Sequence, residues 1–443
     1  MHLRFTRAVG AALVMSLVTL NACADHSTPM EITHVPVGGR AKFNTGDVIT
    51  VTTTRDVVAG SLRAAIAQTT GGETIRFDPS IAGAKITLDT TIDVPNAVTI
   101  EGPADKGMII SGGNKFPIFH IHQGATFKNV TLTEGKELFA GGDFPAAAVF
   151  GKGPLLLDHS TVSGNSILAD AIAGDAVTLV NSTVANNPGP LGAVGIFTPS
   201  PGSVVLFNST VAFNSGGGIK GTTNVTLHNA ILAENGPGGT TNCLTAGPGF
   251  TYLGRSITND TFCGGSVLTV LVTDPQLLPL ADNGGPTQTL ALAPESPAID
   301  GTDCDLTVDQ RYAPRDTRCD IGAFEFQFTN VGITINPRAS VDPKTGVATV
   351  TGTVTCEPDE ESFNLAIDVK QDQHLRRVSG TVEGSTTVPV VCGKTPTPWI
   401  ALVNAATGFE NTTATVSVET ATIPLGMKPS ATSSDVKLFW TRK

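Results

Sequence analysis

Apolar and polar residues alternate in four near-copies of one phrase between residues 155 and 236. The copies read LLLDHSTVSGN, VTLVNSTVANN, VVLFNSTVAFN and VTLHNAILAEN, and a weaker fifth copy precedes them. Alternation over four to eight positions predicts short β-strands, and a repeat every 21 to 30 residues predicts a solenoid. One such strand cannot bury its apolar face alone, so stacked copies must share a core. We therefore predict an all-β fold, a right-handed parallel β-helix.

Aligned columns define the register of this helix. The two apolar columns are Phe127, Leu157, Leu179, Leu206 and Leu227, and Leu132, Val162, Val184, Val211 and Leu232. Each full copy closes on an asparagine, at Asn165, Asn187, Asn214 and Asn235. Another polar column lies at the bend inside each phrase: Asn129, His159, Asn181, Asn208 and Asn229. Asparagine tolerates left-handed backbone, so we expect this bend column to form a stacked ladder of side-chain hydrogen bonds that includes His159.

The chain before the repeats continues the pattern of short strands. We expect strands at 48–52, 73–77, 86–88, 98–102, 108–112 and 118–121. Residues 60–68 have the pattern of a short helix with Ser61 near its start and Leu62, Ala65 and Ile66 on one face. A helix here would cap the open end of the core.

The first residues have the pattern of an export signal. Arg4 and Arg7 precede a 13-residue apolar stretch, which is too short to span a membrane. The sequence Leu-Asn-Ala-Cys that ends at Cys23 resembles a bacterial lipobox, with an ordinary secretory signal as the alternative. We expect residues 1–22 to be a lipoprotein signal peptide, Cys23 to carry the lipid and 23–46 to be a flexible tether. This predicts an exported, lipid-anchored protein at the outer membrane or cell surface.

Residues 327–443 have a different pattern: about eight short runs of alternating apolar and polar residues, separated by turn signals. This spacing predicts a separate antiparallel Ig-like β-sandwich. In one run, Ala348, Val350, Val354 and Cys356 fall on one side and threonines on the other, so one face can be buried. Six cysteines remain besides Cys23, and the simplest pairing is sequence-local: Cys243–Cys263, Cys304–Cys319 and Cys356–Cys392.

Two segments resemble a known family. VTTTRD…GSLRAAI…GGETIRF resembles the CSLREA-type start of bacterial secreted β-helix proteins, although Gly60 and Ala64 replace the Cys and Glu of that motif. Residues 274–326 resemble the choice-of-anchor Q region of the same proteins. The resemblance covers roughly residues 47–326 and implies a β-helix attached to the cell surface, with no assigned catalytic residue.

The net charge of −11 disfavours nucleic acid and anionic membrane surfaces as partners. Pectate-lyase-like solenoids often bind or cleave polysaccharide, which is an argument from fold alone. Asp158 and His159 resemble the Asp-His pair of such lyases, but His159 belongs to the bend column. Glu134 and Glu234 share a column with three turns between them, too far apart for a hydrolase pair. Asp170 and Asp175 lie on one predicted loop, which favours an exposed polar loop over a catalytic pair.

The sequence identifies no metal site. The densest acidic cluster could bind Ca²⁺, but capping and salt bridging with Arg311, Arg315 and Arg318 are the favoured interpretation. His120 and His122 share one strand face without an identifiable third ligand, so we expect them to be surface residues. The acidic cluster consists of Asp300, Asp303, Asp309, Asp316, Asp320 and Glu325.

These patterns predict a surface lipoprotein whose β-helix is a stalk or a binding face for polysaccharide or a surface protein. The membrane is a partner through the N-terminal lipid, no cofactor is expected, and the oligomeric state is open. The alternative is a polysaccharide lyase or glycoside hydrolase.

Overall fold

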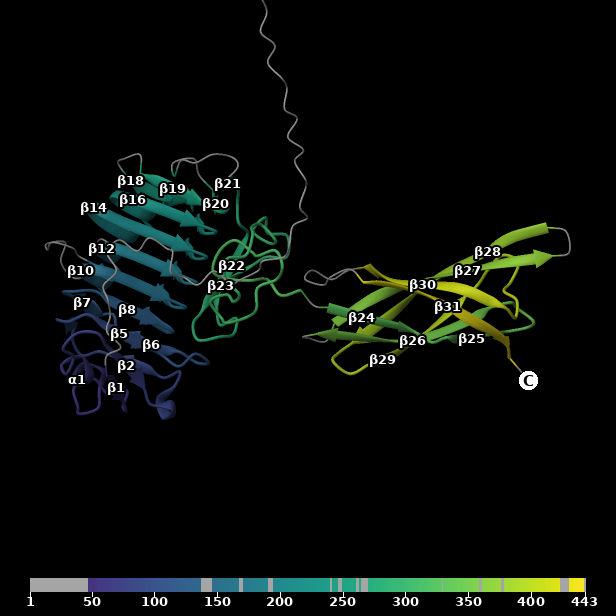
Figure 1. The fold of residues 1–443 in the computed structure, drawn as a ribbon, viewed down its shortest axis with the longest axis horizontal. Helices are drawn as coiled ribbons and strands as arrows, with labels where there is room; N and C mark the ends of the chain where they lie inside the picture. Colours follow the sequence, from purple (N-terminus) through teal and green to yellow (C-terminus); the bar gives the residue numbers. More distant parts are fainter. Residues whose placement is uncertain are drawn as a thin grey trace, which may run out of the picture. The chain divides into compact units, whose positions relative to one another are not determined.

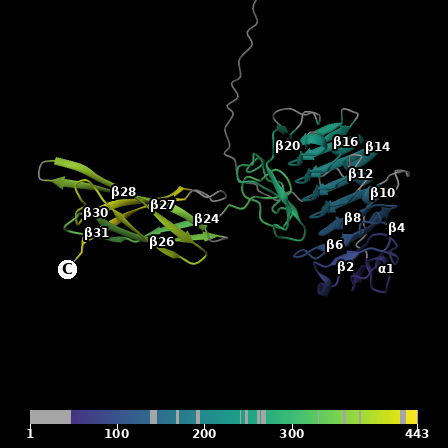
Figure 2. The same cartoon turned by 180° about the vertical axis from the view of Figure 1, so that it is seen from behind.

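The repeated phrases form the turns of a parallel β-helix (Figures 1 and 2). The computed structural model describes residues 47–136, 146–166, 170–189, 194–239, 241–245, 249–259, 263, 270–328, 330–357, 361–375, 378–422 and 430–441. Nearly all of its regular structure is β-strand, and the parallel β-helix has about 7 turns. The fold class predicted from the repeats is therefore confirmed.

One sheet of the β-helix has twelve described strands, in the spatial order β1-β2-β5-β8-β10-β12-β14-β16-β18, with β4, β7 and β19 paired beside them. The strands are β1 (Val48–Val51), β2 (Glu73–Phe77), β4 (Ile92–Val94), β5 (Val98–Glu101), β7 (Phe119–Ile121), β8 (Ala125–Lys128), β10 (Ala146–Asp158), β12 (Asp170–Val180), β14 (Val194–Phe207), β16 (Gly217–His228), β18 (Cys243–Thr245) and β19 (Phe250–Leu253). Each of the long strands β10, β12 and β14 pairs with the next strand in stretches that are separated by a register shift.

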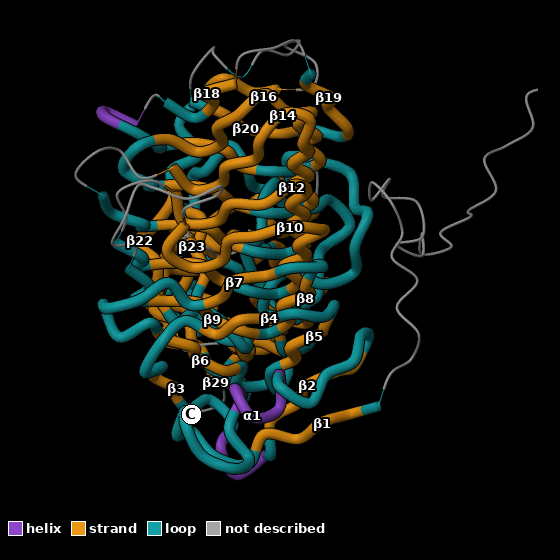
Figure 3. The backbone as a smooth tube through the Cα atoms, turned by 90° about the vertical axis from the view of Figure 1, so that its left-hand side faces the viewer, coloured by secondary structure: helices purple, strands orange, loops and turns teal. Residues whose placement is uncertain are grey.

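The second sheet of the β-helix has nine strands within the described ranges, in the order β21-β20-β17-β15-β13-β11-β9-β6-β3. They are β3 (Lys85–Thr87), β6 (Met108–Ser111), β9 (Val130–Thr133), β11 (Thr161–Ser163), β13 (Thr183–Ala185), β15 (Thr210–Ala212), β17 (Ile231–Ala233), β20 (Ser256–Thr258) and β21 (Val270–Val272). Figure 3 shows the strands stacked as successive orange rungs.

The apolar columns predict the register correctly. Phe127, Leu157, Leu179, Leu206 and Leu227 are successive partners in the first sheet, and Leu132, Val162, Val184, Val211 and Leu232 are successive partners in the second. All of these side chains are fully buried in one core. Stacking therefore buries what a single turn would expose.

The predicted capping helix is α1 (Leu62–Ile66), beside β1 and β2 (Figure 3). The Ser61 hydroxyl accepts a hydrogen bond from the Ala64 N–H at 3.1 Å, which is the expected N-cap. Leu62, Ala65 and Ile66 are buried and extend the core of the β-helix. Two 3₁₀ turns, Pro79–Ile81 and Pro237–Gly239, follow later in the chain.

The C-terminal part forms a separate antiparallel, sandwich-like region. Its described strands are β24 (Asn330–Ile335), β25 (Arg338–Val341), β26 (Ala348–Glu357), β27 (Glu361–Leu375), β28 (Val378–Cys392), β29 (Thr397–Val403), β30 (Thr413–Thr422) and β31 (Ala431–Trp440). Two of the alternating runs, 376–382 and 387–392, were predicted as separate strands but form the single strand β28, and no run was predicted at β25. Ala348, Val350, Val354 and Cys356 are buried as expected, in a core whose members all lie between residues 331 and 438.

Candidate functional site

A C-terminal segment of the β-helical part, residues 274–326, runs along the bend between the two sheets; we call it the strap. It contains a two-stranded sheet of β22 (Leu277–Ala281) and β23 (Thr289–Leu292). The Thr161 hydroxyl donates to the Gln288 carbonyl at 2.6 Å, and the Thr183 hydroxyl donates to Gln310 Oε1 at 2.7 Å. Successive turns of the β-helix are thus tied to a segment more than 100 residues away in sequence.

The bend column has the predicted backbone, since all five of its residues have positive φ between 44° and 55°. Its side chains, however, bond mainly to the strap and not to one another. Tyr312 donates its hydroxyl to Asn129 at 2.7 Å, Arg315 donates to Asn181 at 3.2 Å, and Thr302 donates to Asn229 at 2.6 Å.

Within the bend column, one pair of side chains is in contact: Asn181 Nδ2 lies 3.3 Å from His159 Nε2. Asn208 is fully buried, and neither polar atom of its side chain has a partner. The predicted ladder in this column is therefore wrong, because the strap supplies most of the partners.

The amide ladder instead runs through the asparagines that close each repeat. Asn165, Asn187, Asn214 and Asn235 each donate from Nδ2 to the Oδ1 of the next asparagine, at 3.0, 2.8, 2.9 and 3.0 Å, ending at Asn242. The weaker copy that precedes the four full ones has Gly135 in this column, and the Gly135 N–H donates to Asn165 Oδ1 at 2.8 Å. A Cβ there would lie 2.1 Å from the Ala147 carbonyl oxygen, so the close approach requires glycine.

His159, the residue that resembled a lyase histidine, is covered by the strap. Its ring stacks on Tyr312 with centroids 4.1 Å apart and an interplanar angle of 4°. Its two nitrogens face Asp158 Oδ1 and Asn181 Nδ2, and its carbonyl accepts from the Thr287 hydroxyl at 3.0 Å. Asp158 also lies in register with Lys128, and Asp158 Oδ2 is 3.9 Å from Lys128 Nζ. These contacts give His159 a structural environment.

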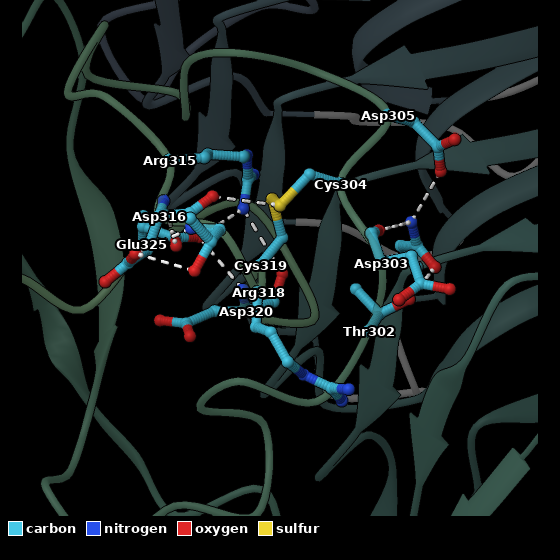
Figure 4. The surroundings of a disulfide bond; sticks show 12 residues. Thr302, Asp303, Cys304, Asp305, Arg315, Asp316, Arg318, Cys319, Asp320 and Glu325 are labelled. Atoms are coloured by element: carbon cyan, nitrogen blue, oxygen red, sulfur yellow. Dashed lines mark hydrogen bonds and ion pairs between the residues drawn. A yellow bond between two sulfur atoms is a disulfide. The ribbon is translucent and has the colours of Figure 1, made fainter. Parts of the chain in front are cut away.

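Three members of the acidic cluster, Asp309, Asp320 and Glu325, are buried in a network of ion pairs and hydrogen bonds, and Figure 4 shows part of it. The other three, Asp300, Asp303 and Asp316, are exposed. Arg315 Nη1 and Glu325 Oε2 lie 2.8 Å apart and both side chains are buried, while Arg311 pairs with buried Asp309 at 2.6 Å. Arg318 donates to the main-chain carbonyl of Asp300 and so does not form the salt bridge expected of it. The arginines and main-chain amides thus occupy the carboxylates of Asp309, Asp320 and Glu325.

Burial perturbs the titration of this network. The pKa of Asp320 is raised to about 7 by burial and by the neighbouring Glu325 carboxylate. Burial also raises the pKa of Glu325, against the opposing effect of Arg315. The Cys304–Cys319 disulfide lies beside the network and closes the loop that carries Asp309, Arg311 and Arg315 (Figure 4). The predicted Cys243–Cys263 and Cys356–Cys392 disulfides are formed as well.

A groove of about 580 Å³ opens beside β2, β5 and β8. Arg76, Glu101 and Lys128 are register partners on these strands and line it together with Tyr312. Glu101 lies 2.8 Å from Arg76 Nε and 3.6 Å from Lys128 Nζ. No Trp or Tyr lies in the repeated phrases, but the strap brings the Tyr312 ring to this groove.

A second cluster lies on β4 and β7. Asp93 and His120 are register partners, and Asp93 Oδ1 lies 3.0 Å from His120 Nδ1 and 2.7 Å from His122 Nε2. Asp93 thus places a potential third ligand atom beside the two histidines, whose side chains reach the surface as expected. Burial and the neighbouring His122 lower the pKa of His120, which favours its neutral imidazole. Of the described residues, only these three bring His, Cys, Asp or Glu ligand atoms together in a group of three.

The comparisons found no matching family model, no matching curated protein and no matching solved structure. The resemblance to CSLREA-type and choice-of-anchor Q proteins therefore stays a prediction. The predicted signal peptide, Cys23 and the tether lie outside the described residues. No helix in the described part of the chain has the length and hydropathy needed to cross a membrane.

Proposed function

We propose that this chain is an exported, lipid-anchored β-helical protein that binds carbohydrate, without catalysis, in the groove beside β2, β5 and β8. The observation that carries the proposal is the combination of three outward charged side chains in register with the Tyr312 ring at one groove. The groove volume lies within the range typical of small-ligand sites.

The lining of the groove matches the chemistry of a sugar. Arg76, Glu101 and Lys128 offer donors and acceptors about 4.8 Å apart, the spacing of adjacent strands, for ring hydroxyls. Phe77 and Pro103 add apolar surface to the same groove. Because the charges are mutually paired, the groove favours neutral hydroxyl-rich ligands over highly charged ones.

The rival class, a lyase or hydrolase, has weaker support. Glu134 and Glu234 are separated by four turn spacings, about 19 Å at the inter-strand distance, against the 5–10 Å that a hydrolase pair requires. Glu134 is also paired with Lys85. The strap covers His159, and Asp170 and Asp175 lie in strand β12, with Asp170 buried, so the exposed loop predicted for them is wrong.

Export has independent support. Disulfides form and persist in oxidising compartments, and the chain has three of them. The lipobox-like sequence at Cys23 supports attachment by lipid.

A glycan array with the purified soluble form tests carbohydrate binding. We expect binding to neutral or mixed glycans, lost in Arg76→Ala and kept in Lys370→Ala, a control that removes a similarly exposed ion pair from the C-terminal region. A parallel assay for newly formed reducing ends distinguishes binding from hydrolysis. Sustained release of reducing ends, or equal binding by both variants, would overturn the proposal.

A further inference from the structure

The side chains of Asp93, His120 and His122 lie together on one face of the β-helix, and all three are of types that bind metal ions. His120 lies in β7 and His122 follows the strand's last residue, and both imidazoles lie against the same side chain, that of Asp93. Pairing of β4 with β7 then places Asp93 directly opposite His120. The Asp93 side chain is 64% exposed, and those of His120 and His122 are 39% and 45% exposed.

Two ring contacts of His120 orient the cluster, one with Phe150 and one with His122. The His120 ring stacks on Phe150, with centroids 4.5 Å apart and an interplanar angle of 9°. The two imidazole centroids are 4.3 Å apart, and both rings direct a nitrogen at the same oxygen of Asp93. The cluster therefore presents two imidazole nitrogens and one carboxylate that converge from a preformed scaffold.

We propose that Asp93, His120 and His122 form a binding site for a divalent transition-metal ion, and that Zn²⁺ fits it best. Two imidazoles and one carboxylate are a common ligand set for zinc, whereas Ca²⁺ takes six or more oxygen ligands. With metal–ligand bonds of about 2.0–2.1 Å, tetrahedral ligands lie about 3.3 Å apart. The observed separations of 2.7 and 3.0 Å need to open by only a few tenths of an ångström, within reach of exposed side chains.

Three protein ligands leave the fourth position of a tetrahedral zinc ion open. Because all three side chains reach the surface, that position faces solvent and is free to take water or a donor atom from a partner. The site shares no residue with the groove. The inference therefore does not depend on carbohydrate binding.

Calorimetric titration of the full chain with ZnCl₂ tests the site directly. The protein carries no polyhistidine tag and is first stripped with a chelator. We expect one Zn²⁺ per chain in the wild type. His122→Ala and Asp93→Ala are each expected to weaken binding by at least tenfold, since even the loss of an outer-shell partner costs 10–100-fold. Bound Co²⁺ should show the visible absorption of a low-coordinate N/O site, lost in the same variants.

His228→Ala is the matched control, because His228 lies 2.7 Å from Asp305 but has no second histidine beside it. This variant should bind Zn²⁺ like the wild type. Melting curves of the metal-free variants check folding, and added Zn²⁺ should raise the melting temperature of the wild type and the control only. Absence of stoichiometric binding to the wild type, or unchanged affinity in both ligand variants, would overturn the proposal.

Discussion

Replacing Asn187 with alanine removes the middle of the amide ladder. Asn187 is fully buried, and its Nδ2 donates to the Val162 carbonyl and to Asn214 Oδ1 at 3.1 and 2.8 Å. Its Oδ1 accepts from the main-chain N–H and from the side chain of Asn165, at 3.1 and 3.0 Å. The substitution therefore leaves several buried polar groups without partners in two neighbouring turns.

Each buried donor or acceptor left unpaired costs about 1–3 kcal/mol, so two or three of them destabilise the β-helix by about 3 kcal/mol or more. For a region of this size we expect the melting temperature to fall by about 6–12 °C. Asn224→Ala is the control, because Asn224 is exposed on β16 and its loss should change stability by at most about 0.5 kcal/mol.

Circular dichroism and tryptophan fluorescence separate the two parts of the chain. Both tryptophans, Trp399 and Trp440, lie in the C-terminal region, and Trp399 is buried. Fluorescence therefore reports that region, while far-ultraviolet dichroism reports all strands. We expect Asn187→Ala to lower the dichroism transition and leave the fluorescence transition in place. A shift no larger than that of Asn224→Ala would refute the ladder as a source of stability.

Three further predictions concern other parts of the chain. Cys23→Ser should release the protein from the membrane fraction, and unchanged fractionation after detergent-free washing would contradict the lipobox interpretation. Residues 327–443 expressed alone in an oxidising compartment should unfold cooperatively with Cys356–Cys392 formed, because their core is separate; absence of a thermal transition would make the partition wrong. Burial raises the pKa of Asp170 to about 7, so its protonated form stabilises the fold below about pH 4 and this contribution is lost as pH rises to 7. Asp170→Asn should therefore gain roughly 2–4 kcal/mol over the wild type between pH 4 and 8, and a pH-independent difference in urea unfolding would contradict this.

The register of the β-helix was predictable because it depends on local repetition. Leu157, Leu179 and Leu206 can be aligned from the sequence alone, and stacked strands must place them together. The same periodicity identified both asparagine columns but not which one forms the ladder. That choice depends on the strap, whose contacts join residues such as Tyr312 and Asn129, 183 positions apart and without any repeat.

The group of Asp93, His120 and His122 shows the same limit of prediction from the sequence. The spacing of His120 and His122 was visible, but their third partner lies on another strand. Asp93 becomes that partner only through the pairing of β4 with β7. This turn precedes the clear repeats, so sequence periodicity could not supply its register.

The groove and the metal cluster can be separated experimentally, and their separation bears on what the surface of the β-helix does. They share no residue, so Arg76→Ala should lose glycan binding and keep Zn²⁺, whereas His122→Ala should do the reverse. If His122→Ala also lost glycan binding, the open coordination position would be part of the glycan site, and added chelator should then abolish binding by the wild type. If the two losses stay independent, the β-helix is a scaffold that carries separate surface sites on different strands of the same turns. A stacked fold permits this arrangement because alternate residues of each strand point outward, so the exposed Arg76 of β2 can change without disturbing the exposed Asp93 of β4.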